Sequence, residues 1–210
     1  MMHIPKQFQE SRVDILQGFM RDYPLCTLIT LSSAGVNANH IPMHVIDTPS
    51  PFGALTCHID KSNRIVDDIH RNGEVLAIFN GPNTYITPSW MPTKKEKGRV
   101  VPTWNYAVVH ARGNARVIED KDWLYQQISA FTDHSETGVH SQWRMSDAPE
   151  EFTAKLMNGV LGLEIIITEL SGKWKVSQNE TLVNRNGITE GLRQGDNAAM
   201  ATLVAAAMEG

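Results

Sequence analysis

Cysteine is scarce in this chain of 210 residues, which contains only Cys26 and Cys57. Both lie in apolar stretches, so we expect small buried thiols in a reducing compartment rather than a disulfide. The amino end lacks the apolar core of a secretion signal, and no apolar run reaches the ~18 residues that cross a bilayer. These absences predict a cytoplasmic protein with no membrane span.

A strong net charge is also missing, because 19 Lys and Arg residues face 23 Asp and Glu residues, for a formal charge of -4. Such a chain has no overall positive field to attract nucleic acid, and it contains no convincing helix-turn-helix. The sequence has no G-x-S-x-G motif, no G-x-G-x-x-G motif and no P-loop, which removes the usual basis for a serine hydrolase, a Rossmann protein or a P-loop nucleotidase. Any anion site must therefore be local.

The hydrophobic patterns predict many short strands and few long helices. Strands are expected over residues 25–32, 36–46, 54–58, 74–79, 84–87, 104–118 and 161–170. Helices are expected over residues 11–22, 65–71, 120–133, 149–158 and 198–208. Pro42 indicates an edge strand or a bulge, and Gly113 indicates a bulge. A turn is expected at Gly81-Pro82-Asn83, and a loop is expected over residues 92–101.

Sequential strands joined by short turns favour antiparallel pairing, and a large number of them favours closure into a barrel. The chain has no internal repeat and no linker rich in Pro, Gly or Ser. We therefore predict a mainly β (α+β) protein. A single domain is expected over residues 1–210, with a helical extension over about 172–210.

A polar segment, His58–Arg64, separates a predicted strand from a predicted helix. Lys61 and Arg64 are cations, and Ser62 and Asn63 can donate hydrogen bonds. Such a group suits a phosphate monoester, because an arginine fork gives paired bonds and a lysine gives a point charge. The alternative is a solvated loop in which Ser62 or Asn63 caps the helix.

Aromatic and polar residues also gather on both sides of the charged loop 92–101. The candidates for ligand contact among them are Tyr85, Ser89, Trp104 and Asn105. Aromatic faces beside a few polar groups suit a flat heterocyclic ligand or a subunit contact, and core packing is an equal alternative. His40 and His44 are four residues apart with Pro42 between them, so they cannot form a helical zinc pair, and no metal site is predicted.

The segment Phe79–Leu124, with its GP-x-x-Y-x-x-PSW and VPTWNY pieces, resembles the signature region of the PaiB family. Members of that family are FMN-binding split-barrel proteins labelled negative transcriptional regulators. GKWKVSQN at 172–179 is also similar, and the resemblance extends from Met2 to about Leu192. It implies an antiparallel split β-barrel of the FMN-binding type with peripheral helices. It also implies a homodimer with FMN at the subunit interface.

The resemblance also implies where the cofactor lies. In related barrels the phosphate is held by a segment like His58–Arg64, and the ring lies against a strand like Leu28-Ile29-Thr30. The partner chain contributes aromatic residues. Spacing singles out no catalytic residue, although His40, His58 and Tyr106 match motif positions and could polarise or protonate a substrate. The expected function is an FMN-binding regulator, and the alternative is a flavin-dependent oxidoreductase of the flavin reductase or pyridoxamine phosphate oxidase kind.

One departure from the family's pattern affects the phosphate segment. Where the family reads Ala-Arg-Ala-Asn-Pro, this chain reads Asp60-Lys61-Ser62-Asn63-Arg64. Only the asparagine is kept, and Asp60 adds a carboxylate that would repel a phosphate if it pointed inward. The departure predicts either weaker FMN binding or a different anionic ligand.

Overall fold

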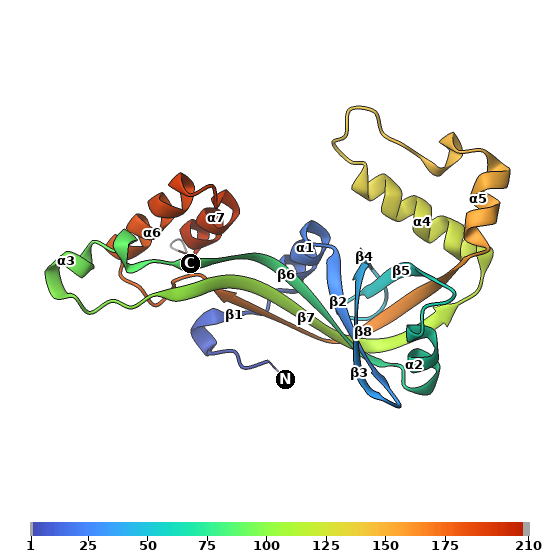
Figure 1. Cartoon of the computed structure of the whole chain (residues 1–210), viewed down its shortest axis with the longest axis horizontal. Helices are drawn as coiled ribbons and strands as arrows, with labels where there is room; N and C mark the ends of the chain where they lie inside the picture. The colour runs from blue at the N-terminus through green and yellow to red at the C-terminus, as the bar shows by residue number, and fades with distance from the viewer. Residues whose placement is uncertain (1, 208–210) are drawn as a thin grey trace. The chain divides into compact units, whose positions relative to one another are not determined.

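The computed structural model describes residues 2–207, and every side chain among them except that of Lys97 (Figure 1). Its strands are β1 (Gln9–Glu10), β2 (Leu25–Ser32), β3 (Gly35–Pro42), β4 (His44–Ile46), β5 (Ala54–Asp60), β6 (Glu74–Ile86), β7 (Thr103–Ile118) and β8 (Val160–Lys175). They form an antiparallel sheet in the order β3-β2-β6-β7-β8-β5-β4, and β1 pairs with β8. The prediction of a mainly β protein with an antiparallel sheet is confirmed.

Helices lie between and after the strands. They are α1 (Val13–Asp22), α2 (Ile65–Arg71), α3 (Thr93–Lys97), α4 (Lys121–Ser135), α5 (Glu150–Met157), α6 (Leu182–Gln194) and α7 (Ala198–Ala206). Short 3-10 helices are η1 (Lys6–Phe8), η2 (Pro88–Trp90) and η3 (Met145–Asp147). Met208, where the last helix was predicted to end, lies outside the described residues. Within those residues no helix has both the length and the apolar character to span a membrane.

The chain forms two compact units. Unit 1 comprises Met1–Phe19, Asn80–His110 and Ser171–Gly210, and unit 2 comprises Met20–Phe79 and Ala111–Leu170. Strands β6, β7 and β8 each supply residues to both units. The single domain over residues 1–210 stays a prediction.

In unit 2 the core is built by strand alternation. Cys26, Leu28 and Thr30 of β2 are buried, while the residues between them face outward. Helix α2 packs on β2, and helix α4 packs on β5. Both cysteines are free and buried, and burial raises the pKa of Cys26 to about 12. They are therefore inert thiols, as predicted, because only a thiolate is a good nucleophile.

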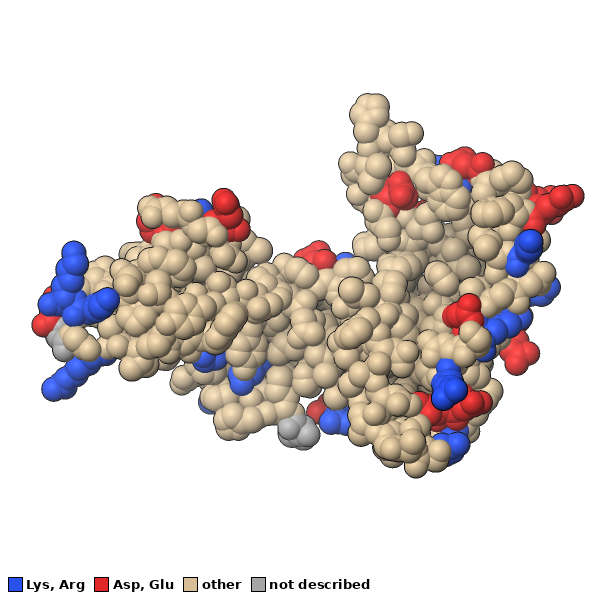
Figure 2. Space-filling view, in the orientation of Figure 1, with Lys and Arg blue, Asp and Glu red and all other residues tan. Residues whose placement is uncertain are grey.

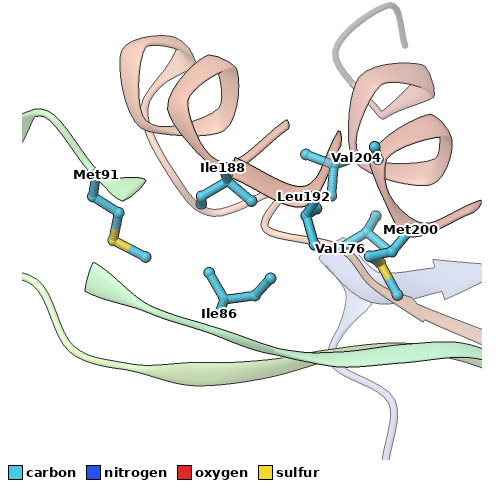
Figure 3. Close-up of a cluster of buried hydrophobic side chains, with 8 residues drawn as sticks. Ile86, Met91, Val176, Ile188, Leu192, Met200 and Val204 are labelled. Atoms are coloured by element: carbon cyan, nitrogen blue, oxygen red, sulfur yellow. The ribbon is translucent and has the colours of Figure 1, made fainter. Parts of the chain in front are cut away.

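In unit 1 the core lies between the strands and helices α6 and α7. Figure 3 shows Ile86 of β6 beneath residues of both helices, and the cluster includes Ile188, Leu192, Met200 and Val204. Burying large aliphatic side chains stabilises such a layer by roughly 1.5–3 kcal/mol for each fully buried residue. The amphipathic helix α6 lies within the predicted helical extension, although the sequence pattern did not single it out.

The predicted turn at Gly81-Pro82-Asn83 is wrong, because β6 runs unbroken from Glu74 to Ile86. The pairing of β6 with β2 ends at Cys26↔Phe79. Beyond that point Pro82 needs no amide hydrogen for a bond to β2, so a proline is tolerated there.

Two smaller features differ from the prediction, and the bulge expected at Gly113 stays a prediction. The strand expected over 36–46 divides into β3 and β4 at Met43, whose N–H donates to the Pro24 carbonyl. The expected loop 92–101 contains α3. Gly113 has a packing role within β7, since a Cβ there would lie 2.3 Å from the Ile166 carbonyl oxygen.

Candidate functional site

The turn that joins β5 to α2 carries two exposed cations, Lys61 and Arg64. Asp60 shapes this turn, because its Oδ1 accepts bonds from the Ser62 N–H at 2.7 Å and from the Ser62 hydroxyl at 2.6 Å. These bonds lower the pKa of the Asp60 carboxyl. The Asp60 charge is thus engaged by Ser62, whose hydroxyl hydrogen is no longer free for a ligand.

The backbone of the turn is also occupied. The Lys61 N–H donates to the Gly159 carbonyl, and the Asn63 N–H donates to that of Asp60. Asn63 Oδ1 accepts a bond from the Ile65 N–H at the amino end of α2. Among residues 2–207 neither Lys61 nor Arg64 forms an ion pair. The two cationic side chains can therefore hold a phosphate, with Asp60 offset by their two charges.

Two of the three strand residues predicted to contact the flavin ring point into the core. Leu28 is fully buried, and the buried Thr30 hydroxyl donates to Asp68 Oδ2 at 2.8 Å. Asn37 of β3 donates to the same carboxylate oxygen at 2.8 Å, which ties α2 to both strands. Of the three, Ile29 has its side chain on the opposite, outward face of β2.

That outward face is apolar and open. Leu25, Ile29 and Leu31 of β2 lie on it, paired with Pro42, Ala38 and Val36 of β3. We call these six residues the open face. Val36 is 72% exposed, and a cavity of about 480 Å³ is lined by aliphatic residues that include Ile29, Leu31 and Val36. Polar residues complete the lining, among them Asn72, Glu74, Arg112, Asn114 and Glu169. A flat ring can lie here against aliphatic side chains.

His40 lies on this same outward face, between the Leu25–Pro42 and Ile29–Ala38 pairs. It is opposite Thr27, whose hydroxyl is 3.2 Å from His40 Nδ1. The imidazole is exposed, and among the described residues its Nε2 has no hydrogen-bond partner, so that nitrogen is available to a ligand on this face.

His58, which was predicted to hold the cofactor, contacts α4. Its Nδ1 lies 3.2 Å from Gln127 Oε1, and its ring lines a second cavity, which is apolar. Gln127 could not be identified from the sequence, because a helical glutamine is ordinarily a surface residue.

The aromatic candidates lie in unit 1. Tyr85 and Trp104 are exposed, and their rings meet edge to face with centroids 6.3 Å apart. Asn105 is fully buried, and its Nδ2 donates to Ser177 Oγ at 2.8 Å, so its role is structural. Ser89 is exposed, and its hydroxyl oxygen accepts a bond from Lys94 Nζ at 3.4 Å. Core packing therefore does not account for Tyr85 and Trp104.

Two lysines near these aromatics were not predicted as site residues. Lys175 donates to Thr103 Oγ1 and to the Trp104 carbonyl, and burial lowers its pKa. Lys173 Nζ lies 5.3 Å from the centre of the Tyr106 ring. Their spacing of two on a strand, within the GKWKVSQN motif, is the signal that could have identified them.

His44 gives unit 2 a pH-dependent stability. Its ring lies 5.6 Å from Phe131 and 5.7 Å from His134, and burial, with His134 and Arg21 nearby, lowers its pKa. The folded state thus favours neutral His44, so the unfolded chain binds more protons as the pH falls through about 6.5. We expect the melting temperature to fall between pH 7 and pH 5, and to fall less for His44→Gln. Parallel pH profiles for the two proteins would contradict this assignment.

Comparison with known proteins identifies the family. The sequence profile described as "Putative FMN-binding domain" matches residues 2–169. An uncharacterised protein of Emericella nidulans is 32% identical in an alignment of 226 positions that covers 90% of each chain. The protease synthase and sporulation protein PAI 2 of Bacillus subtilis is 24% identical, covering 93% of this chain and 91% of the relative.

A solved structure shows the same fold. The flavocytochrome Anf3 of Azotobacter vinelandii superposes with a TM-score of 0.60 at 12% identity, over 82% of this chain and 72% of that one. The predicted split barrel and the PaiB resemblance are confirmed. The chain therefore belongs to the FMN-binding split-barrel family whose profile spans residues 2–169, and FMN is its cofactor.

Proposed function

We propose that this protein is a homodimer that holds FMN between its subunits and serves a regulatory function through the bound flavin. The observation that carries the proposal is the open face of β2 and β3, where aliphatic side chains remain exposed. Apolar surface of this kind on a soluble protein marks a contact with a partner or a ligand. A second subunit and a flavin ring together would remove it from water.

The cofactor's two ends have matching residues in this chain. The phosphate would be held by Lys61 and Arg64, which lack carboxylate partners among the described residues. The ring would lie against Ile29, and the exposed pair Tyr85 and Trp104 of one subunit would cover the ring held by the other. Aromatic side chains with a polar edge are common at such contacts.

The regulatory part of the proposal is supported by the relative PAI 2, whose name refers to protease synthesis and sporulation. Direct contact with DNA is not part of it, because the net charge of -4 supplies little attraction to phosphate. On the face shown in Figure 2, Lys and Arg gather at the α3 end, while acidic and basic residues mix around α2. The protein would then regulate its target indirectly, by acting on a metabolite or on a protein partner. Affinity for promoter DNA at low salt, measured by fluorescence anisotropy, would contradict this indirect route.

A flavin-dependent oxidoreductase is the second candidate, and the exposed His40 beside the open face favours it. FMN supplies hydride and electron transfer when it is bound. His40 would hold or deliver a proton at its free ring nitrogen. Anaerobic addition of NADH or NADPH should bleach the flavin band if this reading is right, and an unchanged band excludes both reductants.

The dimer is tested by placing a charge on the open face. We expect the wild-type protein to sediment as a dimer and to bind FMN in a visible-absorption titration. Val36→Glu should sediment as a monomer and bind FMN at least about tenfold more weakly, because an interfacial charge without a partner opposes burial. Val183→Glu on α6, where the native side chain is 50% exposed, should behave as wild type. A wild-type protein that stays monomeric at all concentrations would refute the proposal.

A further inference from the structure

A second cavity lies in unit 2, between α4, α5 and the segment around η3, and it has a volume of about 280 Å³. Its walls include Ile128, Met145 and Met157, and two of its ten lining residues, His58 and Thr153, are polar. The Thr153 hydroxyl donates to the Glu150 carbonyl at 2.9 Å. The Thr153 hydroxyl hydrogen is thus engaged, and the His58 imidazole provides the ring nitrogen acceptor that this lining offers to a ligand.

The hydrogen bond to Gln127 determines what His58 can offer. Gln127 Oε1 can accept a hydrogen from His58 Nδ1, and in that tautomer Nε2 of the ring keeps a lone pair. Among the described side chains, the buried polar atoms that lack a hydrogen bond are Gln127 Nε2 and Arg185 Nε. His58 Nε2 also has no partner there but is not one of these buried atoms, so it is open to solvent. It can accept a hydrogen bond from a ligand.

The burial of Gln127 supports a functional role for this pair. Gln127 is 6% exposed, and its Nε2 is buried without a partner. An unsatisfied buried donor is unfavourable, and an apolar residue at this position would avoid it. Gln127 is therefore best explained as a positioning residue that sets the orientation and the tautomer of His58.

The rim of the cavity indicates the kind of ligand. Trp143, Phe152 and Leu156 line it and are exposed, although large apolar side chains are ordinarily buried. Among the described lining residues none is Lys or Arg, so a phosphate or a carboxylate would be desolvated there without a counter-charge. The volume of about 280 Å³ lies just below the range for ligand pockets, which starts at roughly 300 Å³, so the ligand must be small. FMN is excluded by its charge.

We propose that this cavity binds a small, uncharged aromatic molecule that carries one hydrogen-bond donor, such as a phenol or an indole. The ring lies between the aromatic rim residues and the aliphatic walls, and its O–H or N–H donates to His58 Nε2. This cavity does not include Lys61 or Arg64, the cations of the proposed FMN site, among its lining residues.

The test uses 2-naphthol as the probe in isothermal titration calorimetry with the full chain. We expect saturable binding of 2-naphthol, binding of 2-methoxynaphthalene that is weaker by about two- to tenfold because it has no donor, and no binding of 2-naphthoate. Equal affinity for the first two probes would overturn the role of His58. Absence of binding by 2-naphthol would overturn the site.

Two variants locate the binding. Leu156→Glu should weaken 2-naphthol binding by at least about tenfold, and FMN binding should be unchanged. Leu182→Glu on α6 is the matched control, because Leu156 is 57% and Leu182 is 58% exposed, and it should leave both affinities unchanged. Equal effects of the two variants on 2-naphthol would refute the assignment. If Leu156→Glu changes the sedimentation coefficient while the wild type binds no 2-naphthol, the rim is a protein contact and the proposal is wrong.

Discussion

Gly187→Ala is expected to lower the free energy of unfolding by at least about 3 kcal/mol. A Cβ at this position of α6 would lie 2.1 Å from the Trp90 carbonyl oxygen and 3.0 Å from Pro92 Cδ. The first of these atoms belongs to the backbone and cannot rotate away. Helix α6 would have to move off η2, and the cluster around Ile188 and Leu192 would lose its packing.

The expected loss of stability in Gly187→Ala is opposite in sign to the effect that helix propensity alone would give. Alanine favours a helix by about 1 kcal/mol over glycine, so a loss of stability can come only from the contact with η2. Gly18→Ala in α1 is the control, because a Cβ there has no atom within 4 Å. We expect Gly18→Ala to be neutral or stabilising in denaturant unfolding followed by circular dichroism. Equal stability of the two variants would show that α6 does not depend on this contact.

The double variant Lys61→Ala/Arg64→Ala should bind FMN at least about a hundredfold more weakly than the wild-type protein. Each charge-assisted hydrogen bond contributes about 1.5–3 kcal/mol, and every 1.4 kcal/mol is about tenfold in affinity. Both side chains are exposed and form no ion pair among the described residues, so their removal should not change folding. The measurement is an FMN titration followed in the visible absorption band.

The matched control removes one lysine and one arginine elsewhere in unit 2. Lys155→Ala/Arg144→Ala makes the same change in net charge at exposed positions on α5 and beside η3. We expect wild-type affinity for FMN from this control. An affinity of Lys61→Ala/Arg64→Ala that equals the control's would remove the β5–α2 turn from the proposed phosphate site and leave the family assignment intact.

Much of the fold follows from local pattern. The spacing of apolar residues predicted α1, α2 and β2 within two residues of their observed bounds, because a helix or strand that buries one face repeats its apolar residues at that period. The prediction of a turn at Gly81-Pro82-Asn83 was wrong, because local composition does not show which strands pair with a given segment. Pro82 is tolerated in β6 because the pairing of β6 with β2 ends at Phe79, before Pro82 is reached.

Some features of the candidate site could be predicted from residue type, and others depend on contacts between distant parts of the chain. From residue chemistry we predicted that Lys61 and Arg64 contact a phosphate and that Tyr85 and Trp104 contact a flat ring. All four side chains are exposed, so they are accessible to a ligand. Residue chemistry could not predict that Thr30 would bond Asp68, or that Asn105 would bond Ser177, because these partners are 38 and 72 residues away in the chain. Long-range partners decide whether a polar side chain serves the fold or a ligand.

By itself, the order of residues determined the strands, the free thiols and the flavin family, since each depends on periodicity or on a contiguous motif. Only the tertiary structure decided which side of β2 meets solvent, how Ser62 hydrogen-bonds the Asp60 carboxylate, and that His58 faces an apolar cavity with Gln127 behind it. The physical reason is that hydrogen-bond satisfaction and burial are properties of neighbours in space, and the folded chain alone chooses those neighbours.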